Sequence, residues 1–240
     1  MKEMRFFYVP DVEATDELPE EEAMHALRVL RLKSGDEMML TDGVGNFYRA
    51  LITIAATRKC MFRLVEKMPQ KALWAGHVHL VVSPTKMMER MEWMVEKATE
   101  IGFDRISFLN CDNSERRVVK VRRLEKIVVS AMKQSRKAWK PVIDEIVSFE
   151  EFLKEDKGGL KFIAHCYDEF PKTDFFDCLQ AADKNEDVTI MIGPEGDFSV
   201  SEVERALAAG YKSVSLGESR LRTETAALAS VMMANLSKRL

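Results

Sequence analysis

Residues 188–202 read VTIMIGPEGDFSVSE, and this stretch indicates the fold of the larger part of the chain. The first five residues are apolar or β-branched, which is typical of a strand buried in a parallel sheet. Gly193 and Gly196 follow at once, and glycine allows the backbone to approach a ligand closely. Ser199 and Glu202 then match a capping box, so a helix begins there. The stretch predicts strand, tight turn and helix, with any ligand at the carboxyl end of the strand.

Two interpretations of this turn fit the residues. Its backbone groups can cradle a nucleotide-like ligand, or the turn is an ordinary tight connection between strand and helix. It is not a P-loop, because no Gly-Lys-Ser/Thr follows, and it lacks the Gly-x-Gly-x-x-Gly pattern of dinucleotide-binding proteins.

A second polar loop follows one strand later. Leu216 and Gly217 end the next apolar run, and residues 218–226 then read ESRLRTETA before the last helical stretch. Arg220 and Arg222 precede a helix N-terminus, which itself attracts anions. Thr223 or Thr225 is expected to cap that helix. The alternative is a solvated charged loop, which is common on protein surfaces.

Outward from these loops, strands alternate with helices. Strands are predicted at 77–82, 105–109, 160–164, 188–192 and 213–216. Met87, Met91 and Met94 recur at helical spacing and are expected in the core, and Gly102 is expected to end that helix. A longer helix is predicted from 121 to 139, ended by Pro141. This alternation predicts an α/β fold with a parallel sheet covered on both faces.

The N-terminal part has a different period. Apolar residues alternate in short runs from 38 to 65, and Asp42-Gly43-Val44-Gly45 between two runs is hairpin chemistry. A third strand is expected at 59–65 and a short helix within 20–32, which together suggest a small β barrel. The polar, proline-containing stretch 67–71 is a candidate linker. The expected domains are residues 1–70 and 75–240.

Composition excludes several classes of protein. The net charge is −3 with 46% hydrophobic residues, as in an ordinary folded protein and unlike an unstructured basic nucleic-acid binder. The four cysteines form no Cys-x-x-Cys pair, so we expect reduced thiols, no disulfide framework and no metal site. No apolar run approaches the ~20 residues of a membrane helix. The acidic start is no signal peptide, and a cytoplasmic protein is expected.

Basic residues nevertheless gather locally. Four of them fall on one face of the predicted helix 121–139, and three more, Arg116, Arg117 and Lys120, precede it. Phosphate binding explains such a concentration, although a solvated helix face is the alternative. Three arginines of the N-terminal part are further candidates. The candidate RNA-binding residues are Arg28, Arg31, Arg49, Arg116, Arg117, Arg122, Lys126, Lys133, Gln134 and Lys137.

The two loops closely resemble the last two motifs of the SPOUT methyltransferases, and specifically of the ribosomal RNA small subunit methyltransferase E family. Residues 96–102 (EKATEIG), 114–116 (SER) and 130–135 (SAMKQS) resemble its first helix and middle segments. Residues 25–31 (HALRVLR) and the Asp42-Gly43-x-Gly45 turn resemble its N-terminal domain. The resemblance therefore spans nearly the whole chain, in order. One departure is Asp197, where many members carry glycine.

The resemblance implies an N-terminal PUA-like β barrel that binds RNA and a C-terminal SPOUT domain with a deep trefoil knot. It implies a homodimer with each active site near the subunit interface. It also implies S-adenosyl-L-methionine as cofactor and N3 of a uridine in 16S ribosomal RNA, within the assembled small subunit, as the methyl acceptor. The residues expected to bind the cofactor are Ile192, Gly193, Pro194, Glu195, Gly196, Leu216, Gly217, Leu221, Thr223 and Thr225.

The chemistry then needs a cation and a proton acceptor. Methyl transfer requires donor and acceptor to be held in line, away from water. A uridine N3 must lose its proton to attack, and a nearby cation stabilises the resulting anion. Arg222 is the first candidate and Arg220 the second. Glu224 is expected to orient the arginine or to accept the proton, and Glu195 is the other possible carboxylate.

Two other functions compete with this hypothesis. A non-catalytic RNA-binding assembly factor is disfavoured by the intact glycines and by the arginine and two threonines at 222–225 (RTET). A dinucleotide-dependent enzyme such as a dehydrogenase is disfavoured because its glycine fingerprint is missing and the glycine-rich turn lies late in the chain.

Overall fold

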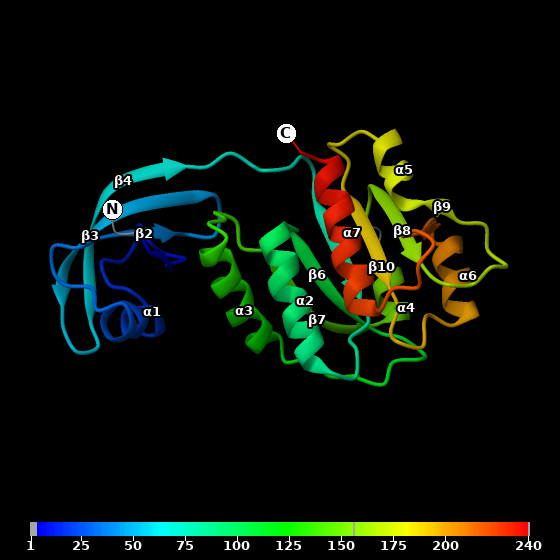
Figure 1. Cartoon of the computed structure of the whole chain (residues 1–240), viewed down its shortest axis with the longest axis horizontal. Helices are drawn as coiled ribbons and strands as arrows, with labels where there is room; N and C mark the ends of the chain where they lie inside the picture. Colours follow the sequence, from blue (N-terminus) through cyan, green and yellow to red (C-terminus); the bar gives the residue numbers. More distant parts are fainter. Residues whose placement is uncertain (1–3, 156, 240) are drawn as a thin grey trace. The chain divides into compact units, whose positions relative to one another are not determined.

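The computed structural model describes residues 4–155 and 157–239, so the first three residues of the expected N-terminal domain lie outside it. The chain divides into two compact units (Figure 1). Unit 1 comprises residues 1–72 and 129–140, and unit 2 comprises residues 73–128 and 141–240. The helix at 121–134 thus contributes its second half to unit 1.

Unit 1 is built on a four-stranded sheet in the order β1-β2-β3-β4. The first pair is parallel and the other two pairs are antiparallel. The strands are β1 (Phe6–Tyr8), β2 (Glu37–Thr41), β3 (Asn46–Ala55) and β4 (Cys60–Pro69). Their apolar faces pack with α1 (Glu20–Met24) and the π-helical η1 (His25–Val29) around a separate core that includes Phe7, Leu40 and Phe62.

The predicted hairpin is confirmed, and its turn shows why glycine stands there. Gly43 has φ 76° and Gly45 has φ 109°, both in the region that disfavours other residues. Within the same unit, a Cβ on Gly45 would lie 2.8 Å from the Trp139 ring. The amides of Gly45 and Lys140 donate to Ala138 O and Gly43 O, which ties the turn to residues 138–140.

Two predictions for unit 1 need correction. The candidate linker at 67–71 is wrong in its first three residues, because β4 continues through Pro69 and pairs with β3 as far as Asn46. The polar composition of residues 67–69 is typical of a strand with one exposed face. The helix predicted within 20–32 becomes π-helical from His25 to Val29, and Arg31 follows with φ 54°.

Unit 2 is a seven-stranded parallel sheet in the order β7-β6-β5-β10-β8-β11-β9. This confirms the predicted fold class. The strands are β5 (Val78–Val82), β6 (Arg105–Asn110), β7 (Val142–Ser148), β8 (Leu160–Ala164), β9 (Thr173–Asp174), β10 (Val188–Ile192) and β11 (Lys212–Ser215).

Helices cover both faces of this sheet (Figure 1). Val188, Ile190 and Ile192 of β10 point into a core shared with α2, α3, α5 and α7, while Met191 points into a second core with α4 and α6. Strand side chains alternate between faces, so the apolar run in β10 fills both cores. The helices are α2 (Met88–Ile101), α3 (Val121–Gln134), α4 (Phe149–Leu153), α5 (Phe175–Ala181), α6 (Val200–Ala208) and α7 (Thr223–Ser237).

Three predictions about these helices are settled. Gly102 caps α2 with φ 125°, as expected. Met91 and Met94 are fully buried, whereas Met87 is 50% exposed at the N-cap, so its place in the core was wrong. The helix predicted to reach residue 139 ends at Gln134, because Arg136 turns into the left-handed region with φ 54°. Lys137 therefore does not continue the helical face.

Candidate active site

A cavity of about 1340 Å³ opens at the carboxyl ends of β8, β10 and β11. Three segments line it: residues 164–168 and 170–172 at and after β8, residues 192–197 at and after β10, and residues 214–224 at and after β11. Arg90 of α2 and Ala226 of α7 complete its wall. Ligands of parallel sheets bind at this end of the strands, so the cavity is the candidate active site of unit 2.

The glycine-rich turn forms the floor of the cavity. Gly193 is buried, and a Cβ there would lie 3.0 Å from the backbone nitrogen of Phe198. A Cβ on Gly196 would lie 3.1 Å from Asn113 Cβ. Asp197 closes the turn by donating its amide to Pro194 O, and it has φ 64°, where a non-glycine residue is uncommon. The turn is therefore too tight for larger residues at either glycine.

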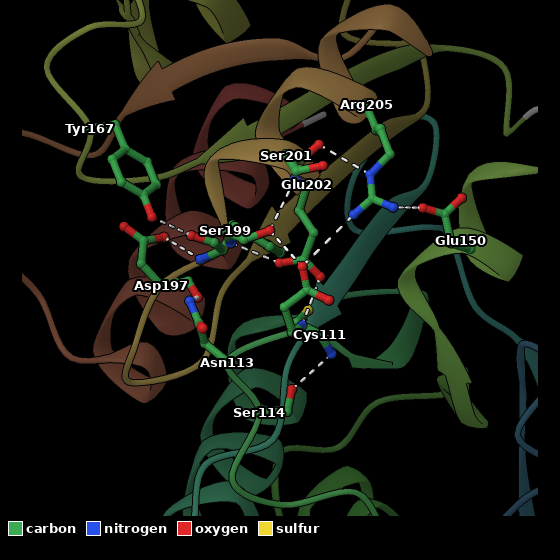
Figure 2. A network of polar contacts seen from close by, with 12 residues as sticks. Cys111, Asn113, Ser114, Glu150, Tyr167, Asp197, Ser199, Ser201, Glu202 and Arg205 are labelled. Carbon is green, nitrogen blue, oxygen red and sulfur yellow. Dashed lines mark hydrogen bonds and ion pairs between the residues drawn. The ribbon is translucent and has the colours of Figure 1, made fainter.

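A polar network holds this turn from behind (Figure 2). Asn113 Nδ2 donates to the carbonyls of Gly196 and Asp197, both at 3.1 Å. The predicted capping box is confirmed, with Ser199 Oγ and the Glu202 carboxylate each accepting the other residue's amide. Glu202 is almost fully buried and also accepts from the amide of Asp112, and burial raises the pKa of its carboxyl. The network fixes the turn to the end of β6.

The second loop is tied to the first through Thr223. Thr223 Oγ1 is buried and donates to Gly193 O at 3.0 Å. The prediction that Thr223 or Thr225 caps α7 is wrong: Arg222 is the N-cap and makes no side-chain capping bond, because the Thr223 hydroxyl is directed to the turn instead. Gly217 has φ 112°, which explains the glycine after Leu216.

An ion pair between a partly exposed arginine and a buried glutamate adjoins this loop. Glu224 is 9% exposed in its side chain, and its Oε1 lies 3.3 Å from Nη1 of Arg90. Both residues also line a second depression of about 360 Å³, together with Glu89, Trp93, Arg222 and Thr225. The Trp93 side chain is half exposed there. Arg90, Arg222 and Glu224 thus belong to the walls of both hollows.

The wall after β8 was not foreseen from the sequence. His165 is buried, its Nε2 lies 2.8 Å from Ser213 Oγ, and burial lowers its pKa. Cys166 is exposed, and burial of part of its surface, together with the Asp197 carboxylate, raises the pKa of its thiol. Nothing in residues 164–172 has the spacing of a known motif, so tertiary structure alone reveals this wall.

Most of the expected cofactor-binding residues come together. All of them line the large cavity except Thr225, which faces the smaller depression. Arg220 and Arg222 are exposed at the cavity. Glu195 accepts the amide of Lys86 at 3.0 Å, which makes it a support for the loop before α2 rather than a free carboxylate.

The candidate RNA-binding residues fall into paired and exposed groups. Arg49 pairs with Glu37 and Glu66, Arg116 donates twice to Lys86 O, and Lys133 Nζ lies 2.5 Å from the nearly buried Glu22. Burial lowers the pKa of Lys137. The exposed candidates are Arg28, which lies in η1, Arg31 and Gln134 in unit 1 and Arg117, Arg122 and Lys126 in unit 2.

Two further observations concern the described residues only. Within them, no group of three or more His, Cys, Asp or Glu side chains is placed to hold a metal ion. Across residues 4–155 and 157–239, no helix has the length and apolar character needed to cross a membrane.

Two family models match the chain. A model described as an RNA methyltransferase domain matches residues 73–235, and one described as an RNA methyltransferase PUA domain matches residues 18–63. A ribosomal RNA small subunit methyltransferase E from Rickettsia conorii is 30% identical over 224 residues, which are 92% of this chain and 89% of that protein.

Solved structures agree with these matches. A probable rRNA-methyltransferase from Porphyromonas gingivalis superposes with a TM-score of 0.91 at 43% identity, covering 98% of each chain. A ribosomal RNA small subunit methyltransferase E from Neisseria gonorrhoeae, bound to S-adenosyl methionine, superposes with a TM-score of 0.84 at 27% identity, covering 95% of each chain.

Proposed function

The chain belongs to the ribosomal RNA small subunit methyltransferase E family, and we propose that it transfers a methyl group from S-adenosylmethionine to N3 of a uridine in 16S ribosomal RNA. The observation that carries this proposal is the cavity at the ends of β8, β10 and β11, because one of its walls is shared with a depression that holds a cation and a carboxylate.

The residues of the cavity fit the cofactor. Gly193 lines the cavity without a side chain, and a Cβ there would lie only 3.0 Å from Phe198 N, so glycine lets a nucleoside approach the backbone closely. Ile192, Leu216 and Leu221 supply an apolar lining for the adenine ring. The volume exceeds the several hundred Å³ typical of ligand sites, so there is room for the methionine part as well. Residues 192–196, Leu216, Gly217, Leu221 and Thr223 would hold it.

The bound cofactor supplies an electrophilic methyl group on a positively charged sulfur. The side chains around it prepare the acceptor. The uridine enters the depression beside Trp93, whose half-exposed ring offers a stacking face. Glu224 takes the N3 proton, and Arg90 holds that carboxylate in place. Arg222 stabilises the uridine anion until N3 bonds the methyl carbon and the carbon–sulfur bond breaks.

RNA binding is divided between the units. Residues 1–70 serve as the RNA-binding domain and residues 75–240 as the catalytic domain. Arg28, Arg31 and Gln134 in unit 1 and Arg117, Arg122 and Lys126 in unit 2 contact phosphates, because their exposed polar side chains can reach a polyanion. Arg220 at the cavity rim assists Arg222.

Two finer features of the fold belong to the same proposal. The N-terminal sheet closes into a PUA-like barrel, which is supported by the bonds of Leu18 N to Cys60 O and Phe62 N to Asp16 O at the β4 edge. The C-terminal domain carries a trefoil knot. After β11 the chain returns past the glycine-rich turn, and α7 packs on α2, β5 and β10, which supports this threading.

The working form is a homodimer in the cytoplasm that acts on the assembled small subunit. Met232 and Leu236 on α7 are exposed apolar side chains, which supports an interface on that helix. The proposed ribosomal RNA substrate supports the cytoplasmic location. Sedimentation of the purified chain tests the dimer.

The decisive test is transfer of labelled methyl from S-adenosylmethionine to small ribosomal subunits that lack their native uridine methylation, with nucleoside analysis of the product. Labelled N3-methyluridine is expected from the native chain, with Arg222→Ala and Glu224→Gln each about a hundredfold slower at unchanged cofactor affinity. Normal turnover of both variants would remove their assigned roles. Absence of cofactor binding by the native chain would favour a non-catalytic assembly factor.

A further inference from the structure

Asp197 stands where many members of the family carry glycine, and its side chain is fully engaged at the donor cavity. Oδ2 accepts the amide of Cys166 at 2.8 Å, and Oδ1 accepts the amide of Phe198 at 2.8 Å. The first bond crosses from the glycine-rich turn to the segment after β8. The second rigidifies the turn itself, so one carboxylate joins two walls of one cavity.

The segment at 165–172 is the wall that needs such a bond. It has no helix or strand of its own between β8 and β9, yet most of its residues line the cavity. Its first residue, His165, is anchored to β11, because His165 Nε2 lies 2.8 Å from Ser213 Oγ. Tyr167 Oη donates to Phe198 O at 2.7 Å, again to the glycine-rich turn. Figure 2 shows Tyr167 and Asp197 reaching the same end of the turn.

We propose that Asp197 is a positioning residue that latches the 165–172 segment onto the glycine-rich turn and so holds the donor cavity in its binding shape. The proposal rests on the proposed function only in naming S-adenosylmethionine as the ligand. An acidic residue near a nucleoside site is more commonly assigned to the ribose hydroxyls. Here each carboxylate oxygen accepts one backbone amide, and one of these bonds crosses to the 165–172 segment, which assigns Asp197 to the wall.

The latch has a calculable effect on donor affinity. A hydrogen bond to a charged group contributes about 1.5–3 kcal/mol, so its loss raises the population of the open segment by about tenfold or more. A ligand that binds only the closed form loses affinity by the closed fraction. The Kd for the donor is therefore expected to rise by the ratio of the closed fraction in the native chain to that in the variant, which approaches about tenfold only when the open form predominates in the variant.

Two substitutions separate the effect of the Asp197 side chain from the effect of its backbone conformation. Asp197→Gly removes both acceptors, and glycine adopts φ 64° without strain. Asp197→Asn is nearly isosteric, tolerates the same backbone, and keeps one oxygen acceptor. Glu169→Gln is the matched control, because Glu169 is an exposed carboxylate of the same segment that does not line the cavity.

The experiment measures hydrogen exchange of peptides covering residues 165–172 in the ligand-free chain, and calorimetry with S-adenosylhomocysteine. In D197G, exchange at the Cys166 amide is expected about tenfold faster, and the Kd and the KM for the donor are expected to rise with the loss of the closed fraction, by up to about tenfold, with kcat within about twofold. D197N is expected to fall between D197G and the native chain, and E169Q to match the native chain.

Two results would overturn the latch: unchanged exchange in D197G, or a Kd that does not follow the closed fraction that exchange gives. A raised Kd with unchanged exchange would make Asp197 a direct ligand of the donor. Failure of the proposed function gives a different result. In that case the native chain binds no S-adenosylhomocysteine, while the exchange of residues 165–172 still responds to D197G.

Discussion

His79 gives the structure a measurable pH dependence. It lies on β5 with its ring buried against Phe152, and its Nε2 is 2.8 Å from Ser107 Oγ. Ser107 Oγ in turn donates to Asp144 Oδ2 at 2.5 Å, so the serine accepts from the imidazole N–H. Burial lowers the pKa of His79 to about 4, outweighing the attraction of Asp144. The neutral ring is therefore the form that the fold accommodates.

The sign and size of the effect follow by linkage. The unfolded histidine binds its proton near its ordinary pKa of 6.5, and the folded one only near pH 4. Stability is thus fully present above pH 6.5 and falls as the pH drops from 6.5 to 4. Between pH 8 and pH 5 this group alone lowers the free energy of unfolding by about 2 kcal/mol. Burial also lowers the pKa of His165, so His165 destabilises the fold at low pH in the same way. This contribution is the same in the parent and in the His79 variant.

The assay is urea unfolding at pH 8 and pH 5 in a Trp139→Phe background, where fluorescence comes from Trp74 and Trp93 of unit 2. His79→Gln keeps a donor for Ser107 but does not titrate. The free energy of unfolding that this variant loses between pH 8 and pH 5 should therefore be about 2 kcal/mol smaller than the loss in the parent. His77→Gln, an exposed histidine just before the same strand, is the control and should behave like the parent. An equal pH effect in H79Q and the parent would refute the reasoning.

Three further outcomes are expected. Thr223→Val loses a buried hydrogen bond to the glycine-rich turn and should lower the free energy of unfolding of unit 2 by about 1–3 kcal/mol in the same assay. Trp93→Ala should raise KM for small subunits by about tenfold at unchanged cofactor affinity, while Trp93→Phe stays near native. Lys133→Ala should destabilise unit 1, because it leaves the nearly buried Glu22 without its ion-pair partner Lys133. Arg122→Ala should instead weaken RNA binding and reduce the slope of log affinity against log salt concentration by about one, as measured by filter binding.

The sequence predicts best where local rules and burial agree. The bounds of β8 and β10, the capping box of α6 and the Gly102 cap of α2 are as predicted, because each depends on neighbouring residues. The strand β7 was missed, since Asp144 and Glu145 interrupt its apolar pattern and Asp144 is used to bind Arg105. Edge strands carry such polar residues, and periodicity alone does not separate them from loops.

The site was predictable in its two loops and not in its third wall. Glycines and charged residues at fixed offsets indicate the turns after β10 and β11. Arg90 and residues 165–172 carry no local pattern, and only the packing of α2 and the sheet order β10-β8-β11 bring them to the cavity. The misplaced helix cap has the same cause, because a tertiary bond to Gly193 O uses the Thr223 hydroxyl.

The ties that shape the cavity also determine how it moves. Thr223, Asp197 and Asn113 each fasten a loop by hydrogen bonds to backbone, and the segments they join lie far apart in the chain. Breaking one such tie costs about 1–3 kcal/mol, well below the 5–15 kcal/mol of unfolding a domain. The walls therefore open locally without unfolding the sheet beneath them. The measured affinity for a donor therefore depends on the fraction of molecules in which these loops are in place.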